Sequence, residues 1–226
     1  MDVHMPAAAA VVNIFAPKSS RVIRALLVNA GRDWSEREIA KAADVSSGMA
    51  HYVCKSLEEH GYLARGASNR MVLVDPVRML KRWAAYNQYD NTNKFLDYYT
   101  FEREIEGFMR NIAKMKLPYA ATVLTGAWLV APFVRPTDLH FYVPDKGTAE
   151  KIAARLGLNP TPRGGNVKFV IPYDEGVFYG RQEVKGVKVV SKVQLYVDLY
   201  NYPARGEEAA SRLLDMILRE WHVSRK

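Results

Sequence analysis

The chain has 226 residues, with 32 basic against 24 acidic side chains, which gives a formal net charge of +8. A hydrophobic fraction of 49% and a charged fraction of 25% exclude a disordered chain, a collagen-like chain and a membrane bundle. The single cysteine excludes an internal disulfide framework and a thiolate zinc site. A basic surplus favours an anionic partner, with nucleic acid first and a membrane surface second.

The first residues do not resemble a leader or a membrane span. The apolar stretch over residues 6–17 is too short to cross a bilayer, and Asn13 interrupts it. No Lys or Arg precedes Lys18, so the positive start of a secretory signal is missing. We therefore expect a loose N-terminal arm over residues 1–17 and a cytoplasmic protein.

The basic surplus is concentrated near the start of the chain. Residues 18–89 hold 12 Lys and Arg against 7 Asp and Glu, whereas residues 90–226 hold 20 against 16. The shorter segment therefore carries more than half of the surplus. This placement indicates that residues 18–89 are the part that meets an anionic partner.

Two helices are predicted first. Apolar residues between Val22 and Ala30 follow helical spacing, and Gly31 fits the end of that helix. Ser35 and Glu38 then form a capping box, in which the serine oxygen accepts a backbone N–H while the glutamate reaches back. The box predicts a short second helix.

A third helix and a basic hairpin follow. Residues 44–45 form a tight turn, and Ser46 is a good N-cap for the helix after it. Two short strands within residues 63–74 flank a Gly-Ala-Ser-Asn tip, with Arg65 and Arg70 on either side. Three helices followed by such a hairpin predict a winged helix-turn-helix.

The winged helix-turn-helix predicts a set of DNA contacts. Its third helix lies in the major groove with its N-terminal residues at base edges, and serines and helix N-terminal amides meet phosphates. Gly48 lets the helix approach the duplex closely, and wing arginines hold a phosphate or enter the minor groove. The expected contacts are Ser46, Ser47, Gly48, Met49, His51, Tyr52, Lys55, Arg65 and Arg70. A protein-interaction module that binds no DNA is the alternative.

A domain boundary is expected after the next helix. Asp75-Pro76 opens that helix, and the polar, turn-rich residues 87–94 follow it. This division gives an N-terminal DNA-binding domain with a connecting helix over residues 18–89 and a C-terminal domain over residues 90–226.

Strands and helices alternate through the C-terminal domain. Strands are expected over 95–101, 120–125, 139–143 and 167–171, a hairpin over 184–190, and helices over 101–112, 126–134, 148–156 and 206–221. Residues 192–201 fit the helical and the strand period equally. The chain is thus predicted to be α+β, with a winged helix-turn-helix followed by an α/β domain that has a mixed sheet.

One arrangement in this domain resembles a nucleotidyltransferase motif. A strand, a Thr-Gly pair and a helix are followed by Asp138 and His140 on a strand. The motif needs a Gly-Ser pair for the triphosphate and two carboxylates one residue apart for metals. Here Ala127 follows the glycine, His140 takes the second carboxylate position, and Asp198 is a candidate third carboxylate. One strand carboxylate does not suit two Mg²⁺ ions, so we expect a degenerate, non-catalytic scaffold, with nucleotidyl transfer as the alternative.

Other catalytic patterns are missing from the sequence. The five histidines lack metal-ligand spacing, and Gly164-Gly165 has no following Lys-Ser or Lys-Thr to form a phosphate cradle. No serine lies in a nucleophile elbow. The sequence therefore predicts no catalytic residue, no metal and no cofactor.

The order of parts resembles the AbiEi-type regulators, the antitoxins of type IV toxin–antitoxin systems and their stand-alone relatives. Besides the winged helix, the motifs that carry the resemblance are Leu124-Thr125-Gly126-Ala127, Leu139-His140-Phe141-Tyr142-Val143, residues 191–200 and residues 205–210. The resemblance covers about residues 20–222. It departs at Lys192, where the family usually has proline, and this weakens the predicted helix start there.

The resemblance implies a function for each domain. The N-terminal domain would bind duplex DNA and repress its own promoter. The C-terminal domain would counter a functional nucleotidyltransferase toxin without forming a stable complex with it. No membrane partner and no enzymatic activity are implied.

Overall fold

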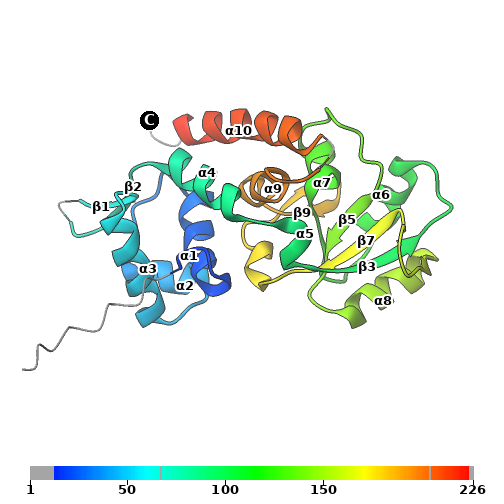
Figure 1. Ribbon diagram of the computed structural model, residues 1–226, viewed down its shortest axis with the longest axis horizontal. Coiled ribbons are helices and arrows are strands. Elements are labelled where there is room, and N and C mark those ends of the chain that lie inside the picture. The colour runs from blue at the N-terminus through cyan, green and yellow to red at the C-terminus, as the bar shows by residue number, and fades with distance from the viewer. Residues whose placement is uncertain (1–12, 67, 204, 224–226) are drawn as a thin grey trace, which may run out of the picture.

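The computed structural model describes residues 13–66, 68–203 and 205–223. Figure 1 shows a group of short helices with a small hairpin at one end of the molecule and a larger sheet with its helices at the other. The last helix, α10 (Gly206–Val223), runs along one side of both parts. Within the described residues, every helix is too short or too polar to span a membrane.

The N-terminal end contains the predicted helices and hairpin. Its elements are α1 (Pro17–Val28), α2 (Glu36–Ala43), α3 (Ser47–Glu59), β1 (Leu63–Arg65), β2 (Met71–Leu73) and α4 (Pro76–Tyr86). The Ser35–Glu38 capping box is present, and the Ser46 and Asp75 side chains cap α3 and α4. Between α2 and α3 the chain turns through Asp44 at φ 51°.

The C-terminal end is built on a mixed seven-stranded sheet in the order β6-β3-β7-β5-β4-β9-β8. The β5–β7 and β4–β9 pairs are parallel and the others antiparallel. The elements are α5 (Tyr89–Thr92), β3 (Lys94–Tyr99), α6 (Ile105–Ala113), β4 (Ala120–Ala121), α7 (Val123–Val130), β5 (Leu139–Tyr142), α8 (Lys146–Leu156), β6 (Asn159–Pro160), β7 (Val167–Ile171), the 3-10 helix η1 (Glu175–Phe178), β8 (Gln182–Val184), β9 (Val187–Val189) and α9 (Lys192–Leu199). The predicted α+β class with a mixed sheet is confirmed.

The strand predicted over 120–125 is wrong beyond its first two residues. β4 ends at Ala121, and α7 begins at Val123, whose φ of 39° turns the chain abruptly. The Ala, Thr, Val and Leu residues here have the composition of a buried strand. Tertiary contacts override that preference, because the Thr125 hydroxyl accepts the His140 N–H of β5 at 2.8 Å.

The structure adds detail at three element boundaries. The predicted arm ends early, since Ile14 is buried and Pro17 already begins α1; residues 1–12 of the arm lie outside the described residues. The boundary segment contains α5, and Asn87 in it is buried and donates to the Val197 carbonyl at 3.2 Å. The segment 192–201, which fits both periods, is helical over Lys192–Leu199, where the Ser191 side chain caps α9 without any proline.

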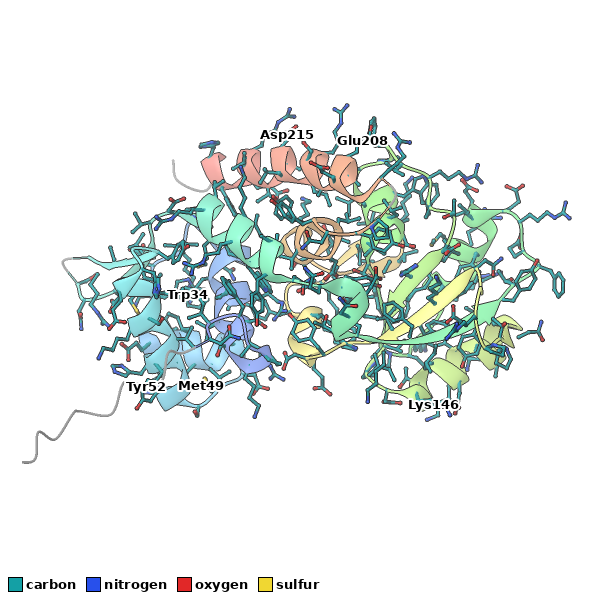
Figure 2. The ribbon with its side chains drawn as sticks, in the orientation of Figure 1. Trp34, Met49, Tyr52, Lys146, Glu208 and Asp215 are labelled. Atoms are coloured by element: carbon teal, nitrogen blue, oxygen red, sulfur yellow. The ribbon has the colours of Figure 1, made fainter. Side chains whose placement is uncertain are left out.

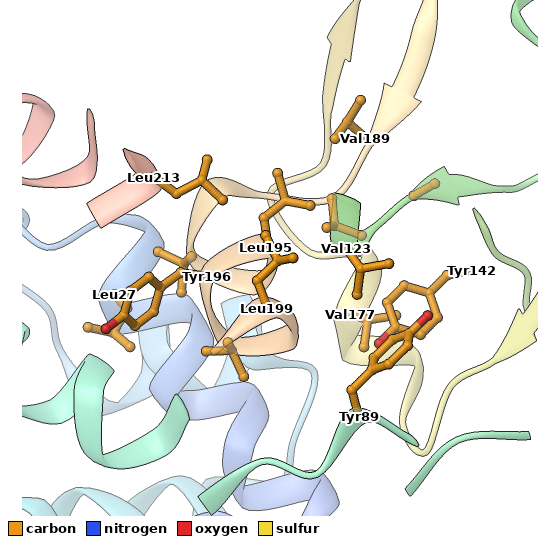
Figure 3. Packing of buried hydrophobic residues seen from close by; sticks show 14 of the residues in the cluster. Leu27, Tyr89, Val123, Tyr142, Val177, Val189, Leu195, Tyr196, Leu199 and Leu213 are labelled. Carbon is orange, nitrogen blue, oxygen red and sulfur yellow. The ribbon is translucent and has the colours of Figure 1, made fainter. Parts of the chain in front are cut away.

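Helix α9 explains why its sequence fits two periods. All of its residues from Val193 to Leu199 are buried, so no polar face reveals a helical period. Figure 3 shows Leu195, Tyr196 and Leu199 of α9 lying between Leu27 of α1 and the sheet side of the core. The buried apolar residues accordingly form one continuous cluster across both ends of the molecule.

Candidate nucleic-acid interface

Helix α3 presents one face to solvent and buries the other. Ala50, Val53 and Leu57 are buried at helical spacing, while Tyr52 on the opposite face is 63% exposed. Figure 2 shows Tyr52 and Met49 at the outer edge of the N-terminal end. The predicted contacts Ser47, Gly48, His51 and Lys55 are exposed as well. The structure therefore brings the predicted helical contacts onto one accessible face.

The first turn of α3 is open but partly occupied by internal contacts. A Cβ placed on Gly48 would meet nothing within 4 Å, so a partner has room to approach the backbone there. The Ser46 hydroxyl already accepts the Met49 N–H at 3.2 Å as the N-cap. The Met49 sulfur lies 3.9 Å from the Ser19 hydroxyl of α1, so this side chain also packs inward.

Arg65 in the hairpin is tied to both neighbouring helices. Its Nη2 donates to Oε1 of Glu36 in α2 at 2.7 Å, and its Nε lies 2.7 Å from Oε1 of Glu58 in α3. His51 Nδ1 lies 3.2 Å from the second oxygen of Glu36. Hydrogen bonds from Arg65 and His51 outweigh desolvation and lower the pKa of Glu36. Glu36 thus links two predicted DNA contacts.

Arg70 is held by a different carboxylate. Its Nη2 donates to Oε2 of Glu38 at 2.7 Å and to the Asp33 carbonyl at 2.8 Å. The pKa of Glu38 falls to about 2, first because the Ser35 backbone N–H and hydroxyl donate to it and then because Arg32 does. The arginines expected to hold phosphate are therefore paired with carboxylates in the free protein. The sequence indicates Glu38 only as part of the capping box, and it does not reveal that Glu36 and Glu58 pair with Arg65.

A buried polar chain joins α1 to the sheet. Asp198 of α9 accepts the Thr122 hydroxyl at 2.6 Å and the Gln194 amide at 2.7 Å. Gln194 Oε1 in turn accepts Nε of Arg24, a fully buried residue of α1, at 2.8 Å. Burial raises the pKa of the Asp198 carboxyl to about 6.

His140 lies in an aromatic enclosure beside this chain. Its Nδ1 is 3.0 Å from the Tyr89 hydroxyl, and its Nε2 is 3.4 Å from the Tyr202 hydroxyl. Burial, followed by the charge of Lys168, lowers the pKa of His140 to about 3, so the ring stays neutral. Asp138 lies outside the enclosure, where its Oδ2 pairs with Lys168 Nζ at 3.3 Å.

The residues of the nucleotidyltransferase-like pattern have packing roles here. A Cβ on Gly126 would lie 2.5 Å from Leu195 Cδ2 and 3.0 Å from the Ala121 carbonyl, so the glycine lets α7 approach α9 and β4. The Thr125 hydroxyl is bonded to β5, as described above. Among the described residues, no group of three or more His, Cys, Asp or Glu side chains is arranged to hold a metal ion.

Comparison with known proteins identifies the family. Residues 72–219 match the family model described as transcriptional regulator, AbiEi antitoxin, type IV TA system. The match covers well over half of the chain, from β2 through the sheet into α10. No curated protein and no solved structure matches the chain. The chain therefore belongs to the AbiEi antitoxin family of transcriptional regulators from type IV toxin–antitoxin systems.

Proposed function

We propose that the chain is a sequence-specific DNA-binding regulator that represses its own promoter in the cytoplasm. Residues 18–89 act as a winged helix-turn-helix, and residues 90–226 form the C-terminal domain. The observation that carries this proposal is the exposed polar face of α3 beside a hairpin that bears Arg65. Membership of a transcriptional-regulator family supports it independently.

The residues of the accessible face would make two kinds of DNA contact, to base edges and to phosphates. His51, Tyr52 and Lys55 extend from the middle of α3 and are long enough to reach base edges or the backbone in a major groove. Ser46 and Ser47 lie at the helix N-terminus, where amides and hydroxyls meet phosphates.

The wing arginines act by exchange of partners. In the free protein Arg65 and Arg70 pair with carboxylates, and both side chains remain more than a third exposed. Exposed ion pairs of this kind contribute only about 0–1 kcal/mol, so a phosphate can replace the carboxylate at little cost. The hairpin would then lie against the DNA backbone, with Arg65 and Arg70 paired to phosphates.

Binding to fragments of the chain's own upstream DNA tests the proposal. His51→Ala and Tyr52→Ala should change which sequence is preferred, because these side chains reach base edges. Arg70→Ala should weaken binding to all sequences and flatten the slope of log affinity against log salt by about one unit. Lys151→Ala, an exposed lysine of α8 at the other end of the molecule, is the matched control. Failure of the native chain to retard any fragment at low salt would instead favour a protein-interaction module.

We further propose that the C-terminal domain counters a nucleotidyltransferase toxin without a stable complex. Co-expression should restore growth in cells that make the toxin, while the two chains do not co-purify. A variant with Lys55→Ala should still protect, because the reading helix would be needed for repression and not for protection. Co-purification of a stable complex would contradict this part.

We propose that the protein itself is not an enzyme. The alternative, nucleotidyl transfer, requires acidic residues that bind metal, yet Asp198 is buried and already bonded to Thr122 and Gln194. Mg²⁺-dependent incorporation of labelled nucleotide into RNA or protein should be absent. Nucleotide incorporation that the Asp138→Ala variant loses would show instead that the protein is a nucleotidyltransferase.

A further inference from the structure

An exposed aromatic pair lies in the loop between β3 and α6. Phe101 is 79% exposed and Tyr99 is 41% exposed, and their rings meet edge to face at 5.0 Å. Figure 1 shows this loop at the end of the molecule away from α3. Neither the proposed duplex interface nor the core uses these rings. Such exposed rings indicate a surface that meets a partner.

The pair borders a cavity of about 350 Å³ that also has two arginines. Ligand pockets typically have volumes of about 300–1,000 Å³. Arg103 and Arg135 both line this cavity and are exposed, and neither has an ion pair or hydrogen bond with another residue in the described ranges. The lining also includes the exposed carboxylate of Glu102, whose Oε1 accepts the Glu104 N–H at 3.0 Å, so the two arginine charges outnumber one carboxylate charge. The cavity therefore offers unpaired positive charge beside aromatic faces.

The aromatic loop is fixed in place by side-chain hydrogen bonds. Asn166 Oδ1 accepts the Thr100 N–H at 2.9 Å, and Asn166 Nδ2 donates to the Thr100 carbonyl at 3.0 Å. The Thr100 hydroxyl accepts the Glu102 N–H at 3.1 Å. The backbone on both sides of Thr100 is thereby held, so the backbone positions that carry Tyr99 and Phe101 are set without a ligand. A preformed site loses less entropy on binding than a loop that must order.

We propose that this aromatic–arginine pocket binds single-stranded nucleic acid. A base stacks on Phe101 beside Tyr99, and the flanking phosphates pair with Arg103 and Arg135. Aromatic rings interleaved with cationic side chains bind single strands in this way, with little sequence preference. The unpaired arginines favour a polyanion over a protein segment as the occupant. The site is independent of the duplex interface on α3.

Fluorescence anisotropy with labelled oligouridylate and oligothymidylate tests the proposal on the full chain. Unlabelled duplex is added in excess at about 0.15 M salt to occupy α3. Phe101→Ala should weaken binding about ten-fold or more, and Phe101→Tyr should retain it, because stacking needs only an aromatic face. Arg135→Ala should flatten the salt slope by about 0.7 units. Arg110→Ala, an exposed arginine of α6 outside the cavity lining, is the control.

Two results would overturn the proposal. One is an oligonucleotide affinity that Phe101→Ala and Arg135→Ala leave unchanged but that Lys55→Ala abolishes, because single strands would then bind on α3. The other is no binding of either oligonucleotide by the native chain, which would leave the aromatic pair to a protein partner. Failure of the native chain to bind any duplex fragment, with oligonucleotide binding intact, would contradict only the proposed regulator function.

Discussion

The arginines of the hairpin and the buried arginine of α1 differ in environment. Arg65 and Arg70 are partly exposed, and each pairs directly with carboxylates. Arg24 is fully buried, donates to the neutral Gln194 and Tyr173 side chains, and lies 5.0 Å from the Trp83 ring centre. Exposed pairs exchange readily with an external anion, whereas a buried guanidinium is committed to its neighbours.

This contrast distinguishes arginines available to an external partner from an arginine that holds the fold together. Under the proposed function, Arg65 and Arg70 of the hairpin would exchange their carboxylates for phosphates without disturbing the core. Arg24 instead connects α1 to α9, and through Gln194 and Asp198 it reaches Thr122 at the start of α7. The N-terminal helices are thereby attached to the sheet by buried polar contacts as well as by the shared core in Figure 3. The C-terminal region is consequently attached to α1, the helix against which α3 packs.

The sharpest test of the contrast is Arg24→Ala. We expect the free energy of unfolding to fall by about 2–5 kcal/mol, because the variant leaves a cavity and the buried Gln194 oxygen loses its donor. Arg37→Ala, at an exposed position of α2, should change it by less than about 0.5 kcal/mol. Urea unfolding of both variants measures the difference. If Arg24→Ala and Arg37→Ala lowered the free energy of unfolding by similarly small amounts, the proposed difference between buried and exposed arginines would be wrong.

Asp198→Asn tests the buried network of Arg24, Gln194 and Asp198 through the pH dependence of stability. The carboxyl pKa is raised from 3.8 to about 6 in the folded protein, so the folded state binds more protons than the unfolded state between these values. This contribution to stability is complete below about pH 4 and is lost as the pH rises through about 6, with a size up to about 3 kcal/mol. The variant should lack that slope. Urea unfolding midpoints measured from pH 4 to pH 7 test this, with Asp138→Asn as the control. A pH slope in Asp198→Asn equal to that of the native chain would contradict the assignment.

Gly126→Ala separates packing from catalysis. The added Cβ would meet Leu195 and the Ala121 carbonyl, so we expect a loss of about 1–3 kcal/mol from overpacking. Gly48→Ala has open space in the first turn of α3, so it should change stability by less than about 0.5 kcal/mol. Thermal unfolding compares the two. A Gly126→Ala chain of native stability that had lost a nucleotidyl-transfer activity would restore the enzyme reading.

Glu36→Gln gives the smallest expected effect. It removes the carboxylate that Arg65 and His51 share, which should cost less than about 1 kcal/mol of stability. Duplex affinity should rise a few-fold at low salt, since one negative charge beside the phosphates is gone. Glu59→Gln, at an exposed position of α3, is the control. Weaker binding in Glu36→Gln would mean that Glu36 positions Arg65 for its phosphate.

Local chemistry made part of the fold predictable. The Ser35–Glu38 capping box, the Ser46 cap and the Asp75-Pro76 start each involve residues within three positions of one another, and the structure has all of them. The exposed face of α3 followed from the same helical spacing. The DNA contacts assigned to that face, and the domain boundary, stay predictions.

Contacts between distant residues account for what the sequence missed. Glu36 meets Arg65 across 29 positions, and Arg24 meets Gln194 across 170, so no local pattern reveals either pair. The wing arginines looked free for that reason, and the strand expected over 120–125 gave way to α7 through contacts with β5.

By itself the sequence determined the caps, the amphipathic helices and the basic surplus of the first third, because these depend on neighbouring residues and on composition. Only the tertiary structure decided that α9 is a helix buried on all sides, that Gly126 serves packing, and that each wing arginine has a carboxylate partner. Burial on every face removes the polar spacing from which a helix is recognised, and ion pairs between separate elements form only when the chain has folded.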